Sequence, residues 1–183
     1  MFLEGNEVYF RPLSVDDADE FYRWGCDREV VKYSLSSFSY PKSKSDMESW
    51  LRNINNDSKT FSLGICLKDT DQLIGYAGIA SISNLNRSGE YFILIGHKSH
   101  WGKGIATNTT EIITDYGFNT LGLHRIELTA YNENPAAYKA YEKAGYVHEG
   151  VKRQAGFRDG KFHDKIIMSA LSTEWQKSKS NTE

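Results

Sequence analysis

The stretch EYFILIGHKSHWGKGIATN, residues 90–108, decides the fold class that this chain of 183 residues is expected to adopt. Its first seven residues form an almost unbroken apolar run, which is typical of a strand that is covered on both faces. Gly102 and Gly104 follow this run, and a segment with helical spacing begins directly after them. A strand, a glycine turn and a helix in this order predict a mixed α/β protein whose helices pack on a sheet.

The glycine turn itself has two interpretations. A tight turn between a strand and a helix often needs a residue that tolerates positive φ, and glycine is the usual choice. The same turn collects free backbone N–H groups at the positive end of a helix dipole, and such groups bind phosphate. The spacing of the glycines excludes a Walker A loop, and the dinucleotide pattern GxGxxG is excluded because Gly104 is followed by IATN. On these residues alone both interpretations stay open.

The other segments predict a central, mostly antiparallel sheet of about six to seven strands flanked by about four helices. Strands are expected at residues 7–13, 60–67, 73–82, 90–96 and 124–131 and in a closing hairpin over 146–171, and helices at 15–24, 41–54, 106–120 and 134–146. The dipeptide Asp159-Gly160 suits a type I′ turn in that hairpin. Residues 27–40 show no clean period, and we expect an irregular or lid-like segment there.

The composition excludes several classes of function. A formal net charge of −2 gives no general attraction to nucleic acid or to an anionic membrane surface. Cys26 and Cys66 occur in no CxxC or Cys/His pattern, and the sequence predicts no metal site. The first ten residues lack the apolar region of a signal peptide, and no apolar run approaches the roughly 20 residues of a membrane span. We therefore expect a cytoplasmic protein with one domain over residues 1–175 and a polar tail over residues 176–183.

Residues 90–108 and the later stretch NENPAAYKAYEKAGYVHEG, residues 132–150, together resemble the GNAT superfamily of acetyl-CoA-dependent N-acetyltransferases, and most closely its RimJ/RimL-like branch. Residues 3–24 look like the opening strand and helix of that branch, and residues 153–171 look like its closing hairpin. The acyl-CoA motif of the family is Q/R-x-x-G-x-G/A, and here it is WGKGIA, with tryptophan at the first position. The resemblance implies a sheet that is splayed between the strands EYFILIG and HRIELTAY, with acetyl-CoA in the split.

The resemblance also implies which residues hold the cofactor. The pantetheine arm pairs with the strand at residues 90–96 as an added strand would, and the pyrophosphate meets the N–H groups that follow Trp101. Asn134 matches the asparagine that opens the next helix of the family, and Tyr141 matches the tyrosine beside the thioester sulfur. The residues implied to bind acetyl-CoA are Ile93, Leu94, Ile95, Trp101, Gly102, Lys103, Gly104, Ile105, Ala106, Thr107, Asn134, Ala137 and Tyr141.

Two side chains are expected to move protons. A primary amine with a pKa near ~10 arrives protonated, so the transfer needs a base or a chain of waters. Glu90, at the start of its strand, is the first choice for this base. The alternatives are His97, His100 and Glu127. The resemblance implies that the Tyr141 hydroxyl donates a proton to the departing thiolate, while a backbone N–H near Leu94 polarises the carbonyl. Outside the motif, Tyr141 is an ordinary core tyrosine and Glu90 an ordinary solvated carboxylate.

These features predict direct transfer of an acetyl group to a primary amine, because neither cysteine lies in a motif that would support an acetyl-enzyme. The branch acts on protein N-termini, polyamines, amino sugars and aminoglycosides, so the expected acceptor is a small molecule or a peptide. The alternative is a catalytically silent module that binds or senses acyl-CoA. A plain α/β scaffold is the third possibility.

Charged residues give conflicting indications about the acceptor. Arg153, Arg158 and Lys161 indicate an anionic group, either on the acceptor or as the 3′-phosphate of CoA. The acidic residues within positions 16–20 indicate a cation instead, and each set is also compatible with an ordinary solvated surface. The sequence therefore leaves the acceptor open, and it leaves open whether the protein is a monomer or a homodimer.

Overall fold

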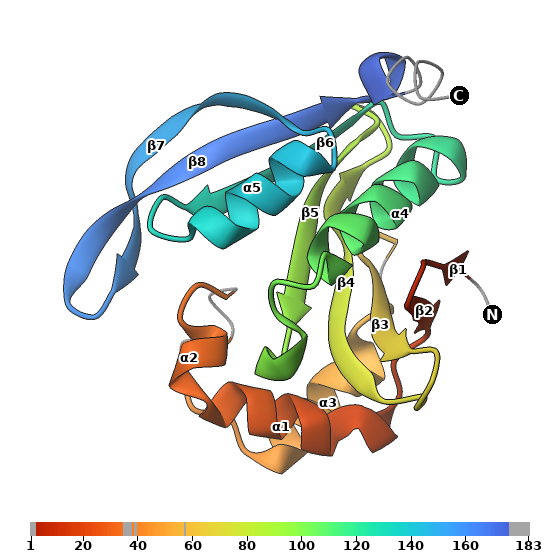
Figure 1. Ribbon diagram of the computed structural model, residues 1–183, viewed down its shortest axis with the longest axis vertical. Helices are drawn as coiled ribbons and strands as arrows, with labels where there is room; N and C mark the ends of the chain where they lie inside the picture. Colours follow the sequence, from red (N-terminus) through yellow and green to blue (C-terminus); the bar gives the residue numbers. More distant parts are fainter. Residues whose placement is uncertain (1–2, 35–37, 39, 57, 176–183) are drawn as a thin grey trace.

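The computed structural model describes residues 3–34, 38, 40–56 and 58–175 (Figure 1). These residues form one open sheet of eight strands together with the five α-helices named below, and residues 172–175 are also helical. The strands are β1 (Leu3–Glu4), β2 (Val8–Arg11), β3 (Phe61–Leu67), β4 (Leu73–Ser83), β5 (Ser88–Ile95), β6 (Arg125–Tyr131), β7 (Val147–Arg158) and β8 (Lys161–Leu171). The α-helices are α1 (Ala18–Cys26), α2 (Arg28–Val31), α3 (Lys44–Asn53), α4 (Ile105–Asn119) and α5 (Pro135–Lys143).

The sheet has the strand order β1-β2-β3-β4-β5-β6-β8-β7. Every neighbouring pair is antiparallel except β5 and β6, which run parallel. The expected mostly antiparallel mixed sheet is therefore confirmed, with one strand more than predicted. The additional strand, β1, has only two residues, which is too short for a periodic pattern to reveal.

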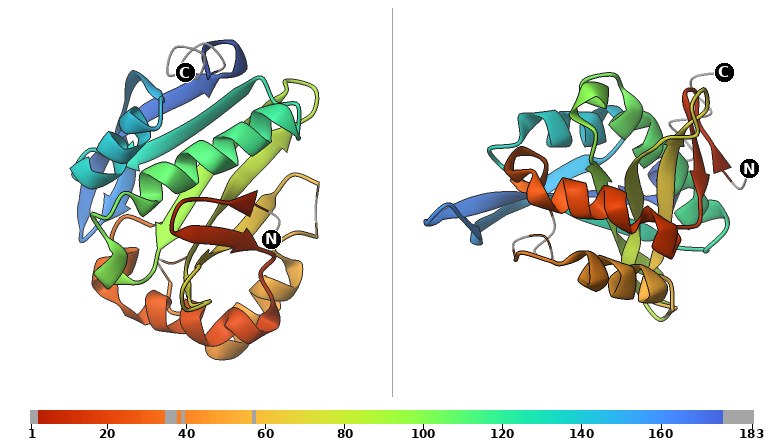
Figure 2. Two further views of the ribbon diagram at one scale, coloured as in Figure 1. Left: turned by 45° about the vertical axis from the view of Figure 1, so that its right-hand side comes forward. Right: turned by 90° about the horizontal axis from the view of Figure 1, so that it is seen from below.

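The sheet is split between β5 and β6, as the resemblance implies. The two strands pair only where Ser88, Gly89 and Glu90 lie beside residues 125–127. Beyond Glu90 the strands diverge, while β5 stays paired with β4 up to Ile95 (Figures 1 and 2). Residues 91–95 of β5 therefore have a strand on one side only, within the described part of the chain.

Helices cover both faces of the sheet (Figure 2). On one face, α4 and α5 enclose a core that includes Ile113, Ile126 and Met168, all with no exposed surface. On the other face, α1 and α3 enclose a second core built around Phe21 and Leu51. The split between β5 and β6 interrupts the sheet between these two helical layers. A ligand in the split can therefore reach groups from both faces.

Helix α4 is rich in threonine and is held by packing, as its weak intrinsic propensity requires. Thr109, Thr110 and Thr114 are all fully buried. The Thr110 hydroxyl donates to the Ala106 carbonyl at 2.7 Å and is hydrogen-bonded to the Tyr91 hydroxyl at 3.0 Å. This contact fixes the first turns of α4 against β5, next to the split.

The N-terminal region differs in detail from the expectation. Ser14 does cap a helical segment, with Asp17 completing the capping box, but that segment is a 3₁₀ turn over Val15–Asp17 that precedes α1. Residues 27–40, which we expected to be irregular, contain the one-turn helix α2, because the Asp27 carboxylate accepts hydrogen bonds from two N–H groups of its first turn. Residues 35–37 and 39, and the tail predicted at 176–183, lie outside the described residues.

The closing hairpin of β7 and β8 extends past the helices (Figures 1 and 2). Its turn residues Asp159 and Gly160 have φ angles of 49° and 74°, which confirms the predicted pair of positive φ values of a type I′ turn. Near this turn the Arg158 guanidinium donates to the Ser34 carbonyl at 3.3 Å. This hydrogen bond joins the hairpin to the loop after α2.

Candidate active site

The open edge of β5 presents peptide groups at alternate residues. Gly96 donates its N–H to the Ile74 carbonyl at 2.8 Å, and in an antiparallel pair every second residue points its peptide groups to the same neighbour. The peptide groups of Leu94 therefore face β4. Those of Ile93 and Ile95 face the split, where a ligand with amide groups can pair with them.

The glycine turn lies at the end of β5 and has the shape of an anion cradle. Gly102 and Gly104 have φ angles of +74° and +81°, a region that other residues rarely adopt. A Cβ atom at either position would meet nothing within 4 Å, so conformation and not crowding requires glycine, and the space above the turn is open. Gly104 is the N-cap of the 15-residue α4 and no side chain caps its first N–H groups. These N–H groups fit a pyrophosphate.

Trp101 ties this cradle to the strand. Its indole Nε1 donates to the Ile95 carbonyl at 2.9 Å, and its ring stays 42% exposed. The indole N–H thus occupies the carbonyl of Ile95, one of the two residues whose peptide groups face the split. The sequence alone does not reveal this role for a tryptophan at the first motif position.

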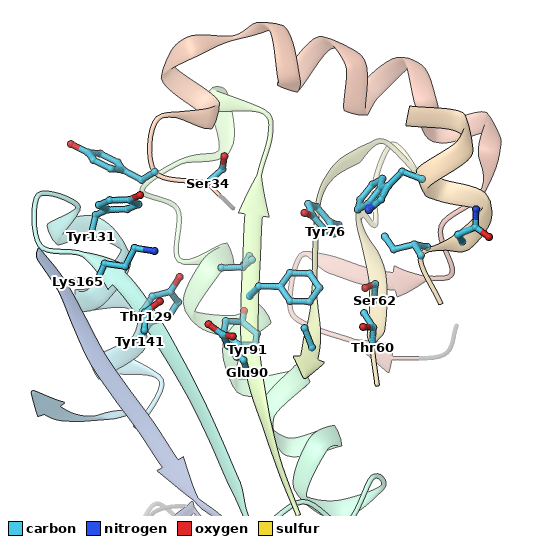
Figure 3. Close-up of a pocket in the computed structure, with 17 residues that line it drawn as sticks. Ser34, Thr60, Ser62, Tyr76, Glu90, Tyr91, Thr129, Tyr131, Tyr141 and Lys165 are labelled. Atoms are coloured by element: carbon cyan, nitrogen blue, oxygen red, sulfur yellow. The ribbon is translucent and has the colours of Figure 1, made fainter. Parts of the chain in front are cut away.

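A cavity of about 530 Å³ opens at the split and extends over the face covered by α3 (Figure 3). Most of its described wall is aromatic or carries a hydroxyl group. The aromatic residues are Tyr33, Trp50, Tyr76, Tyr91, Phe92, Tyr131 and Tyr141. Glu90 and Lys165 are the charged residues among the described lining residues. The cavity therefore suits an organic ligand of small to moderate size.

Tyr141 reaches this cavity from α5, on the opposite face of the sheet (Figure 3). Its ring packs edge-on against Tyr91 at 6.0 Å between centroids, and 9% of the residue is exposed. Burial raises the pKa of Tyr141 to about 12. The hydroxyl is therefore a proton donor at neutral pH, as a general acid must be.

Glu90 lines the same cavity and differs from the other three candidates for the base. Among the described residues its carboxylate has no ion-pair partner within 4.0 Å, whereas Glu127, its neighbour in register on β6, is held by Arg125 at 2.9 Å. His97 lies 3.2 Å from Glu20, and neither His97 nor His100 lines the cavity. Glu90 and Tyr141 thus line one cavity, whereas the alternative candidates for the base do not line it.

Three further residues that are expected to bind the cofactor differ in their surroundings. The Asn134 side chain caps α5 by accepting a hydrogen bond from the Ala137 N–H at 3.3 Å. Ile105 is buried in the core below the cradle, while Lys103 is exposed. No group of three or more metal-binding side chains occurs in the described part of the chain.

The acidic residues near the start of α1 do not face the cavity. Three of them are engaged in ion pairs. These pairs are Asp17 with Arg11 at 2.6 Å, Asp19 with Lys44 at 2.7 Å and Glu20 with Arg23 at 3.0 Å. The acidic segment therefore does not contribute to this cavity, and the cation that it indicates stays a sequence prediction.

Several cavity residues have no signal in the sequence. Lys165 lies on β8 within the stretch that resembles the closing hairpin, but no motif singles it out, and only its alternation with the buried Ile166 places it on the cavity face. The hydroxyl groups of Ser62, Tyr76 and Tyr131 are buried and have no hydrogen-bond partner among the described residues. Each such unpartnered buried hydroxyl carries a free-energy penalty.

Comparisons with known proteins agree with this geometry. Residues 7–147 match the family model described as the acetyltransferase (GNAT) domain. The chain is 30% identical over 166 residues to the uncharacterized N-acetyltransferase p20 of Bacillus licheniformis, which covers 90% of this chain and 93% of that protein. It is 36% identical over 103 residues to the spermidine N(1)-acetyltransferase of Vibrio cholerae, over 56% of this chain and 59% of that protein.

Among solved structures, the spermidine N-acetyltransferase from Vibrio cholerae in complex with CoA and spermine has a similar fold, with a TM-score of 0.82. That similarity covers 93% of this chain and 98% of the neighbour at 27% identity. No helix in the described residues is long and apolar enough to cross a membrane.

Proposed function

The chain belongs to the GNAT family of N-acetyltransferases, which use acetyl-CoA as co-substrate, and from this premise we propose that it transfers the acetyl group directly to a primary amine held in the cavity. One observation carries this proposal. Glu90 and Tyr141 come from opposite faces of the sheet, yet both line one cavity at the split beside an unpaired strand edge.

The cofactor site follows from the backbone. When bound, acetyl-CoA supplies an acyl group activated as a thioester. In this proposal the N–H groups of residues 102–107 hold its pyrophosphate, with Lys103 and Ala106 beside it, and the Ile95 N–H and the Ile93 carbonyl pair with its pantetheine arm. The N–H that polarises the thioester carbonyl is then that of Ile93 and not that of Leu94, whose peptide groups face β4.

The chemistry needs two proton transfers. The amine nitrogen attacks the carbonyl carbon of the thioester, so that a carbon–nitrogen bond forms and the carbon–sulfur bond breaks. Glu90 accepts the proton that the amine loses, directly or through water, and the Tyr141 hydroxyl donates a proton to the departing sulfur. The products are an amide and the free thiol of CoA.

The finer assignments remain proposals. We place the protein in the RimJ/RimL-like branch, in the cytoplasm, with one catalytic domain over residues 1–175 and without nucleic-acid or membrane partners. A polyamine acceptor is the second candidate within this function, because relatives named as spermidine N-acetyltransferases match the chain. Protein N-termini, amino sugars and aminoglycosides are the other acceptor classes of the branch.

The test follows release of the CoA thiol with a panel of amines. Tyr141→Phe is expected to lower kcat by about 100-fold or more with little change in CoA affinity, since general acids contribute that much. Tyr138→Phe is the matched control, because Tyr138 lies on the same helix and does not line the cavity. An equal loss of CoA affinity and kcat would contradict the acid role. Tight CoA binding with no amine accepted would instead indicate the catalytically silent module.

A further inference from the structure

We propose that the amine acceptor also carries a carboxylate, and that this group binds at Lys165 while the amine lies at Glu90. The proposal rests on the function proposed above and specifies the chemical class of its acceptor. It comes from the charges in the cavity, the surroundings of Lys165 and the aromatic residues of the cavity wall.

The cavity holds two charges of opposite sign that form no ion pair with each other. Glu90 and Lys165 both line it, and neither has an ion-pair partner within 4.0 Å among the described residues. Lys165 is partly buried, and leaving such a charge without an ion-pair partner is unfavourable, so Lys165 indicates where an anionic group of a ligand binds. The exposed carboxylate of Glu90 is open to an ammonium group. A ligand with one ammonium and one carboxylate satisfies both.

The surroundings of Lys165 favour an anion. Its Nζ lies 4.9 Å from the centre of the Tyr131 ring, and the Arg158 guanidinium lies 5.4 Å from the centre of the same ring. Lys152 is opposite Lys165 in the register of β7 and β8. Burial lowers the pKa of Lys165, and Arg158 lowers it further, while Glu90 raises it. A carboxylate beside Lys165 relieves the repulsion among these cations.

The cavity wall on the side of α3 suits an apolar body. Trp50, Tyr76 and Phe92 line the cavity there, with Trp50 and Tyr76 in edge contact at 5.6 Å. The hydroxyl oxygens of Ser62 and Tyr131 are buried and lack hydrogen-bond partners among the described residues. An amino acid with an aromatic or branched apolar side chain has this combination of groups.

The same features disfavour a polyamine. A polycation needs several free carboxylates along its path, but Asp17 and Asp19 are paired with Arg11 and Lys44 and do not line the cavity. At the hairpin end of the cavity a second ammonium would meet Lys165. Among the described lining residues, only Glu90 offers a carboxylate to a cationic group.

The experiment compares amines that differ only in the carboxylate. Phenylalanine is paired with 2-phenylethylamine, tryptophan with tryptamine and leucine with isoamylamine, and spermidine is assayed beside them. We expect the carboxylate member of at least one pair to have a kcat/KM about tenfold higher or more, as hydrogen bonds to charged groups provide. Lys165→Met should abolish this ratio, Lys165→Arg should retain it, and Lys161→Met, an exposed lysine on the same strand, should leave it unchanged.

A second readout separates this proposal from the proposed function. Calorimetry with the CoA-loaded protein measures the affinity for each amine pair without turnover. Equal kcat/KM and equal affinity within every pair, or a clear preference for spermidine, would overturn the carboxylate site while acetyl transfer itself stands. A preference in binding that depends on Lys165, without acetylation of any amine, would support the site and overturn the transferase assignment.

Discussion

The cofactor end and the acceptor end of the site are built in opposite ways. The cradle at residues 101–107 is one contiguous stretch whose proposed binding groups are backbone N–H groups. The acceptor cavity collects side chains from β3, β4, β5, β6, β8, α5 and the α3 region. A backbone site depends on conformation and tolerates most side chains, whereas a side-chain site changes its ligand when one residue changes. This difference lets one fold keep its cofactor while its acceptor varies.

The cradle is most sensitive at its positive-φ glycines. Gly104→Val is expected to lower CoA affinity by about 100-fold or more, because a branched residue held at a φ of +81° costs about 1–3 kcal/mol and its side chain occupies the open space above the turn. Isothermal titration of CoA measures the loss, and circular dichroism checks the fold.

Gly160→Val is the matched control for this change. Gly160 has a φ of +74° and equally open surroundings, but it lies in the hairpin turn between β7 and β8. The control should therefore suffer similar strain and keep its CoA affinity. Undiminished affinity in Gly104→Val would show that the glycine turn is only a turn.

The acceptor end should respond through turnover and not through cofactor affinity. Glu90→Gln is expected to lower kcat/KM for the amine by about 100-fold, the usual contribution of a general base, with CoA affinity unchanged. Glu127→Gln serves as the control, because Glu127 lies beside Glu90 in register but is bound to Arg125. Comparable losses of kcat/KM in both variants would mean that the two carboxylates act only through their negative charge, and that Glu90 is not the base.

The glycine turn could be predicted from the sequence because it is local. Two glycines after an apolar run and before a helix require a strand-to-helix turn, and its direction on the sheet follows from the strand before it. The interpretation of this turn as a cradle rests on the later stretch with Asn134 and Tyr141, through the resemblance, and stays a proposal. The split of the sheet, which the resemblance also implied, is confirmed by the short pairing of β5 with β6.

The acceptor cavity could not be predicted because its residues are distant in sequence. Lys165 and Tyr131 meet only through the pairing of β6 with β8. The expectation for Leu94 shows the second limit. A shift of one residue along a strand reverses the direction of every peptide group, and nothing in the run EYFILIG indicates which residues face β4. Register comes from the neighbouring strand.

Trp101 connects the two ends and should have a moderate effect. Trp101→Phe keeps an aromatic ring but removes the indole donor to the Ile95 carbonyl, a hydrogen bond of 2.9 Å. We expect the KM for acetyl-CoA to rise about three- to tenfold, as the loss of one hydrogen bond predicts, with kcat nearly unchanged. A larger fall in kcat than rise in KM would place Trp101 at the acceptor end instead.

The smallest effect is expected where β5 and β6 still pair, at the closed end of the split. There Arg125 binds the Glu149 carboxylate at 2.6 Å, and the hydrogen bonds from Arg125 and Ser169 lower the pKa of Glu149 from 4.5 to about 2. A pKa that is lower in the folded state stabilises the protein above about pH 4.5, and this contribution is lost as the pH falls toward 2. Since the Glu149 side chain is 38% exposed, solvent screening limits it to about 1 kcal/mol.

Glu149→Gln should therefore lower the free energy of unfolding in urea by about 1 kcal/mol at pH 7, and the difference from the unchanged protein should shrink as the pH falls through 4.5. Glu142→Gln is the control, because Glu142 is exposed on α5 and has no ion-pair partner within 4.0 Å among the described residues. A difference that persists at pH 2.5 would assign the effect to packing and not to the ion pair. CoA affinity should stay unchanged in both variants, because the cradle and the open edge of β5 lie away from the closed end of the split.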